Sequence, residues 1–173
     1  MKKIIYIYFI LASLLTSNIL IAETIHFLDY RYILNESIAG KKAQSELKNK
    51  LDKNIKSIQS KEKSIRDEEK KIIQQKKIIS PEEYKKKIND LRKKVSLLQS
   101  ERNKILSSVA NERAKAKNKI LENLNPILSY YMSKNNIKKI LDKKNLVRAD
   151  NSLDITKQIV ELLNKKIKSI KIN

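Results

Sequence analysis

The sequence predicts a mostly helical α+β protein in which a long antiparallel helical hairpin is inserted between N-terminal and C-terminal strands. The 173 residues include one glycine and two prolines, and so few turn formers favour long helices. Apolar residues recur in the a and d pattern of a coiled coil on both sides of one proline,. Beyond residue 22, short apolar runs typical of strands occur only near the two ends of the chain,.

Residues 1–22 are typical of a secretory signal peptide. Lys2 and Lys3 precede an apolar core from Ile4 to Leu15, which is shorter than the roughly twenty residues that span a bilayer. Ala22 supplies the small residue at a cleavage site. We therefore expect cleavage after Ala22 and export, and an uncleaved membrane anchor is the alternative.

The hairpin is predicted to turn at residues 80–83, Ser-Pro-Glu-Glu. Pro81 cannot continue a preceding helix but suits the first turn of the next one. Ser80 and Glu83 can form a capping box there. The two helices should therefore run antiparallel, in a register where facing residue numbers add up to about 163.

The predicted arm seam is a row of apolar residues along the facing sides of the two helices. Before the turn these residues recur every seven positions, and after it they recur mainly every four and three positions. The members of the seam are Leu51, Ile58, Ile65, Ile72, Ile79, Tyr84, Ile88, Leu91, Val95, Leu98 and Ile105. The same register places Glu62 beside Arg102 as an inter-helix ion pair. Glu69 and Lys76 also interrupt the seam, so each heptad offers about one apolar side chain where a stable coil offers two. We expect a mobile distal arm.

Basic residues accumulate at the arm tip. Between Lys70 and Lys94 there are ten basic and three acidic residues. The tentative binding residues for a client protein or an anionic surface are Lys76, Lys77, Lys85, Lys86, Lys87, Arg92, Lys93 and Lys94. An ordinary solvated helix face is the alternative interpretation, although like charges at i,i+4 spacing disfavour the helix. The net charge of +20 implies an acidic surface or an acidic client,.

The N-terminal part of the expected body contains a strand at residues 25–29 and a turn of helix at 30–35. Gly40 marks either a flexible point or a close packing contact before the long helix. Further along, Pro126 is expected to kink the returning helix, which should end within residues 133–136.

The C-terminal part is expected to form an antiparallel β-hairpin from residues 137–141 and 146–149, followed by a helix capped by Asp154,. The domain prediction is a body from 23–40 and 133–173, with an arm from 41–132. A body of about 60 residues buries too little surface to be stable alone, so oligomerisation is expected.

Several kinds of chemistry are excluded by composition. The sequence has no cysteine, one histidine (His26) and one glycine, so thiolate metal sites, disulfides and glycine-rich phosphate loops are absent. The carboxylate clusters at 67–69 and 82–83 lie on lysine-rich helix surfaces, where solvated ion pairing is the default. We predict no enzyme, no catalytic residue, no metal and no cofactor.

The two ends of the mature chain resemble a known family. Residues 25–29 (IHFLD), 33–37 (ILNES) and 39–43 (AGKKA) resemble the opening of the Skp/OmpH family of periplasmic chaperones. Residues 140–147 and 153–156 are similar to its closing segment. The resemblance implies a periplasmic homotrimer with a small β body and three helical arms around a cavity. It also implies that the protein holds unfolded outer-membrane proteins without ATP.

Two other functions remain open at this stage. The lysine-rich tips could bind anionic lipid or lipopolysaccharide at the envelope surface. A basic coiled coil could also bind nucleic acid non-specifically, but the signal peptide argues against this, and no specific nucleic acid is expected as a partner. The chaperone interpretation accounts for the basic tip through long-range attraction of acidic clients.

Overall fold

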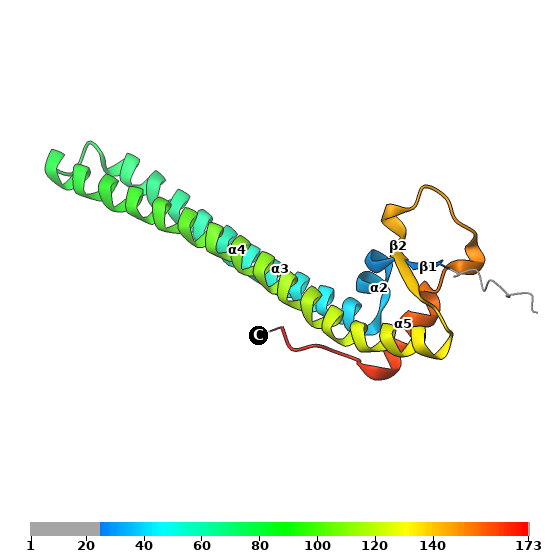
Figure 1. The fold of residues 1–173 in the computed structure, drawn as a ribbon. Helices are drawn as coiled ribbons and strands as arrows, with labels where there is room; N and C mark the ends of the chain where they lie inside the picture. Colours follow the sequence, from blue (N-terminus) through cyan, green and yellow to red (C-terminus); the bar gives the residue numbers. More distant parts are fainter. Residues whose placement is uncertain (1–24, 173) are drawn as a thin grey trace, which may run out of the picture.

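A long helical hairpin projects from a small body in the structure, which is a computed structural model describing residues 25–172 (Figure 1). The hairpin consists of α3 (Ile38–Gln75) and α4 (Pro81–Lys134). At 1.5 Å per residue these helices are about 57 and 81 Å long. The predicted fold class is confirmed, whereas the predicted signal peptide lies outside the described residues. Within the described range, no helix is both long and apolar enough to cross a membrane.

The turn at the arm tip is longer than the sequence predicted. Helix α3 ends at Gln75, and the backbone N–H groups of Ile78 and Ile79 both donate to the Gln75 carbonyl oxygen. The expectation that Ile79 continues the helical seam is therefore wrong. Ser80 has an extended backbone and accepts a hydrogen bond from the Glu83 N–H at 3.2 Å, which begins α4 at Pro81. A proline disfavours the helical conformation in the residue before it, which is therefore usually extended. Helix α3 accordingly ends before Ser80.

The seam between α3 and α4 is buried at widely separated points. Ile58, Ile72 and Leu91 are between 4% and 7% exposed. Six other seam residues are half-buried, namely Leu51, Ile65, Tyr84, Ile88, Leu98 and Ile105, and Ile79 is half-buried in the turn. Val95 is 51% exposed, so its assignment to the buried seam is wrong. In the predicted register Val95 faces Glu68, whose charged side chain offers no apolar partner.

The body contains a two-stranded parallel sheet that joins the two ends of the chain. Strand β1 (Ile25–Leu28) pairs with β2 (Lys139–Asp142), with Ile25 opposite Lys139 and Leu28 opposite Asp142. The predicted β-hairpin is therefore wrong, because β2 pairs with a strand more than a hundred residues away. After β2 the chain enters the 3-10 helix η1 (Lys143–Asn145), with Asp142 accepting from the Lys144 N–H.

The body core forms where four elements meet. Its buried members come from β1, α2 (Tyr30–Glu36), the end of α4 and α5 (Thr156–Lys166). They are Leu28, Ile33, Ile120, Leu124, Ile127, Ile155, Ile159 and Leu163. Helix α4 continues as one element through Pro126. The helix that returns from the arm therefore also builds the body.

The start of α5 is tied to β1 rather than capped by its N-cap side chain. The Asp29 N–H donates to Thr156 Oγ1 at 2.9 Å, and the Ile155 N–H donates to the Phe27 carbonyl at 3.0 Å. Asp154 accepts from the Thr156 N–H at 2.9 Å, which is close to its predicted capping role. The short 3-10 helix η2 (Asn151–Leu153) leads into this junction.

Gly40 lies at the corner where the arm leaves the body. A Cβ at this position would come closer than 3.0 Å to the Leu34 carbonyl oxygen and 2.9 Å from Ser37 Oγ. Ser37 Oγ accepts from the Gly40 N–H at 3.1 Å. The Ile38 N–H donates to Asn164 Oδ1 of α5 at 2.8 Å. Gly40 is therefore a close packing point, which is one of the two roles expected for it.

Candidate functional site

Exposed ion pairs connect the two helices along the arm. Lys50 pairs with Glu112, Lys61 with Glu101, Glu62 with Arg102 and Glu68 with Lys94. The paired residue numbers add up to 162 or 164, which agrees with the predicted register near 163. The Lys50 hydrogen bond is the main cause that lowers the pKa of Glu112. Exposed pairs contribute at most about 1 kcal/mol each, so these pairs agree with the register but add little to the stability of the arm.

Four of the eight predicted tip cations have partners. Lys87 lies 3.8 Å from Glu83, Lys93 lies 3.9 Å from Asp90, and Lys94 lies 2.6 Å from Glu68. The Lys76 ammonium lies 5.8 Å from the centroid of the Tyr84 ring.

The remaining four form what we call the free tip cations: Lys77, Lys85, Lys86 and Arg92. All are exposed, and none forms an ion pair with a residue in the described range. They offer uncompensated positive charge at the far end of the arm. An acidic polymer or an anionic surface is the partner class that this charge attracts.

Large apolar side chains are exposed along the arm, and the sequence interpretation missed their importance. Ile73 is 57% exposed, Ile78 82%, Leu97 70% and Leu106 57%. The signal was available in the doublets Ile72-Ile73 and Ile78-Ile79, because only one member of each pair can face the seam. Isolated exposed apolar residues are ordinary. Here Ile78 directly follows the free tip cation Lys77 in the sequence, so apolar and cationic side chains are both exposed at the arm tip.

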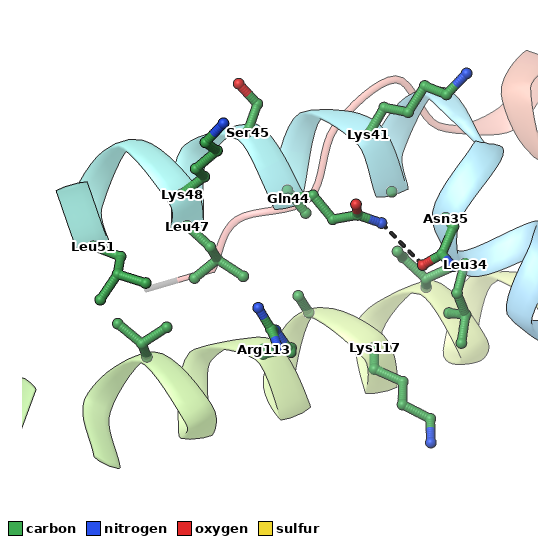
Figure 2. A pocket seen from close by; sticks show the side chains of 15 residues that line it. Leu34, Asn35, Lys41, Gln44, Ser45, Leu47, Lys48, Leu51, Arg113 and Lys117 are labelled. Atoms are coloured by element: carbon green, nitrogen blue, oxygen red, sulfur yellow. Dashed lines mark hydrogen bonds between the residues drawn. The ribbon is translucent and has the colours of Figure 1, made fainter. Parts of the chain in front are cut away.

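A cavity of about 810 Å³, which we call the root cavity, lies at the base of the arm (Figure 2). Its apolar lining comes from Leu34, Leu47, Leu51, Val109, Ala116 and Ile120. Lys41 and Lys48 from α3, and Arg113 and Lys117 from α4, are among its lining residues. Figure 2 shows Arg113 reaching into the space between the helices, whereas the ends of Lys41, Lys48 and Lys117 point away from it. The hydrogen bond from Gln44 Nε2 to Asn35 Oδ1, at 3.0 Å, closes its end toward the body.

Small residues leave room for the root cavity. Ala43 of α3 and Ala116 of α4 are 4% and 5% exposed, and both line the cavity. Their side chains are too short to fill the space between two helices. Lys41 forms an ion pair with Glu36 at 2.8 Å, and the hydrogen bond between them raises the pKa of Lys41, so its ammonium group stays charged while the Glu36 carboxylate offsets that charge. In the sequence, only the small residues Ala43 and Ala116 could have indicated this cavity.

Potential metal ligands do not cluster among the described residues. Within the described part of the chain, no three His, Cys, Asp or Glu side chains gather in a group that could hold a metal ion. His26 lies half-buried in β1, away from the arm. The surfaces available for contact are the free tip cations, the exposed apolar residues of the arm and the root cavity.

Comparisons with known proteins match most of the chain. A family model described as outer membrane protein (OmpH-like) matches residues 24–163. A crystal structure from Caulobacter crescentus CB15, provisionally described as an OmpH-like outer membrane chaperone, superposes with a TM-score of 0.79. The two sequences are 18% identical, and the match covers 85% of this chain and 87% of the other. The search of curated proteins found no match.

Proposed function

Because the chain belongs to the OmpH-like family, whose model matches residues 24–163, we propose that it is an ATP-independent holdase for unfolded outer-membrane proteins. Family membership supports a chaperone role and a periplasmic location. The holdase mechanism is our proposal, and so are the homotrimer, in which three arms surround a cavity, and the export of the chain by cleavage after Ala22.

The observation that carries this proposal is the combination of surfaces on the arm. Exposed apolar side chains such as Ile78 and Leu97 lie on the same arm as the free tip cations. An unfolded β-barrel precursor exposes alternating apolar residues and is often acidic. Electrostatic attraction would therefore speed its capture, and many weak apolar contacts would hold it without an energy source.

The test measures aggregation of an unfolded outer-membrane β-barrel protein when it is diluted out of urea. With the mature chain present and no nucleotide, light scattering from aggregates should fall in proportion to the chaperone concentration. Static light scattering of the chaperone alone should give a mass near three subunits. If the mature chain leaves aggregation unchanged at several-fold excess, the holdase proposal is wrong.

The contribution of the tip is tested with two matched variants. Replacing Lys77, Lys85, Lys86 and Arg92 by Gln removes four cations that lack ion-pair partners among the described residues. This change should slow client capture at low salt and have little effect at high salt, where charges are screened. The control replaces by Gln the four tip cations that have partners, Lys76, Lys87, Lys93 and Lys94. A capture rate at low salt equal to that of wild type in the first variant would remove the electrostatic role of the free tip cations, and equal slowing in both variants would show that they act no differently from the paired cations.

An anionic-surface role is the second candidate, and the free tip cations are the observation that favours it. Clustered lysines and arginines bind anionic lipid headgroups or lipopolysaccharide through the same attraction. Sedimentation with vesicles that contain or lack anionic lipid distinguishes the two roles. A chaperone that captures clients equally well in the absence of lipid supports the first role.

A further inference from the structure

The last six described residues, 167–172, form a C-terminal tail that folds back onto the root of the arm (Figure 1). The tail begins after α5 with Ile167 in an extended conformation, at φ −134° and ψ 138°. The family match ends at residue 163, so the tail lies beyond the part of the chain that the family describes.

The tail packs on what we call the root patch, formed by Ala43, Leu47 and Ala116. Ile172 is 7% exposed and is a buried member of the same apolar cluster. Ile170 packs both on this cluster and on the body core. Lys171, between them, is exposed, and its carbonyl oxygen accepts a hydrogen bond from Lys119 Nζ of α4. The root patch thus holds an extended segment whose apolar residues alternate with a polar one.

The charge of the tail is unfavourable for binding to the root patch. The tail brings Lys168 and Lys171 to a chain whose net charge is +20, and neither lysine forms an ion pair with any described residue. Apolar burial and the bond to Lys119 hold it against repulsion. A segment with the same apolar spacing but acidic residues between would keep the apolar contacts and gain attraction.

We propose that the root patch is a binding site for extended, acidic polypeptide segments with apolar residues at alternate positions, and that the tail is an intramolecular occupant which such a segment displaces. All three patch residues also line the root cavity, so an incoming segment lies next to further apolar surface. The identification of this segment with part of an outer-membrane client rests on the function proposed above.

Competition by the tail lowers the apparent affinity of the site. A ligand that binds only the tail-free state has an apparent Kd equal to the intrinsic Kd divided by the fraction of molecules with the tail released. Replacing Ile172 by Ser removes the most buried tail contact, and therefore raises that fraction. If the tail occupies the patch in nine of ten wild-type molecules, its full release raises the affinity about tenfold.

The experiment uses a fluorescent synthetic peptide in which Val or Leu alternates with Asp. Fluorescence anisotropy measures its binding to the mature wild-type chain, to Ile172→Ser and to Lys168→Ser. We expect Ile172→Ser to bind about tenfold more tightly than wild type. Lys168→Ser, which changes an exposed tail residue, should stay within about twofold because it leaves the apolar contacts in place. A peptide of the same composition with the Val and Asp residues in separate blocks should bind weakly.

Two results would overturn the proposal. One is an unchanged peptide affinity in Ile172→Ser when circular dichroism shows a wild-type helix content. If that variant does not fold, a chain ending at Lys166 is measured instead, and an unchanged affinity has the same meaning. The other is peptide binding that survives Leu47→Asp in the Ile172→Ser background, because the site would then lie elsewhere.

The peptide assay is independent of the client assay. If the wild-type chain suppresses aggregation but loss of the tail does not raise the peptide affinity, only the tail mechanism is contradicted. Peptide binding that follows the tail variants, without suppression of aggregation, contradicts the holdase proposal alone.

Discussion

Replacing Gly40 by Ala should destabilise the protein, although the same change in most helices is stabilising. Ala gains about 1 kcal/mol in intrinsic helix propensity. Against this, the new Cβ would lie 2.9 Å from the Leu34 carbonyl carbon and closer still to its oxygen. These are backbone atoms, so α2 and α3 must move apart. Overpacking of this kind costs about 1 to 3 kcal/mol, and the absence of a flexible neighbour argues for the upper end.

The net effect expected for Gly40→Ala is about 2 kcal/mol of lost stability, which lowers Tm by about 4 to 8 °C in a chain of this length. Thermal melting followed by circular dichroism at fixed protein concentration measures it. Ser45→Ala, at an exposed position of the same helix, is the control and should stay within about 0.5 kcal/mol of wild type. A Gly40→Ala protein as stable as wild type would refute the close-packing argument.

Two further predictions concern the arm and the body. Ile72→Ala should cost about 2 kcal/mol, at the low end for a buried Ile because the seam is thin, and should speed amide hydrogen exchange in the distal arm. Ile73→Ala, at the neighbouring position that is 57% exposed, is the matched control. Equal rates of hydrogen exchange in the two variants would contradict the role of Ile72 in holding the two helices together. In the body, burial acts to raise the pKa of Asp154, but hydrogen bonds from Thr156 and the charge of Lys143 outweigh it and leave the pKa lowered. Stability from Asp154 is therefore present above about pH 4 and lost as the pH falls through the lowered pKa. Urea denaturation should find Asp154→Asn less stable than wild type at neutral pH and equal to it at strongly acidic pH, and a constant difference would exclude this linkage.

The hairpin could be predicted from the sequence because its determinants are local and periodic. Heptad spacing fixes which face of each helix is apolar, and Ser80-Pro81 fixes where the chain reverses. The register followed from folding the two apolar seams together about the turn, and it placed Glu62 beside Arg102, which meet in the structure. Val95 shows the limit of this reasoning, because it has the heptad spacing of the seam and is nevertheless 51% exposed.

The body could not be predicted as well, because its contacts join distant parts of the chain. Residues 137–149 looked like a local hairpin, whereas β2 pairs in parallel with β1 from the other end. Nothing within residues 137–149 encodes that partner. The binding surfaces depended on the same kind of information. The unpaired charge of Lys77 and the burial of Ile172 emerge only when side chains from separate helices are brought together.

The sequence by itself therefore determined the helices, the reversal at Pro81, the register of the arm and the resemblance to a chaperone family. Tertiary structure alone decided the parallel sheet, the close contact at Gly40, the root cavity and the position of the tail. The physical reason is that helical periodicity and capping act over a few residues, whereas strand pairing and cavity formation depend on which distant surfaces meet. In this protein those distant surfaces meet at the root of the arm, where the body, both long helices and the C-terminal tail are in contact.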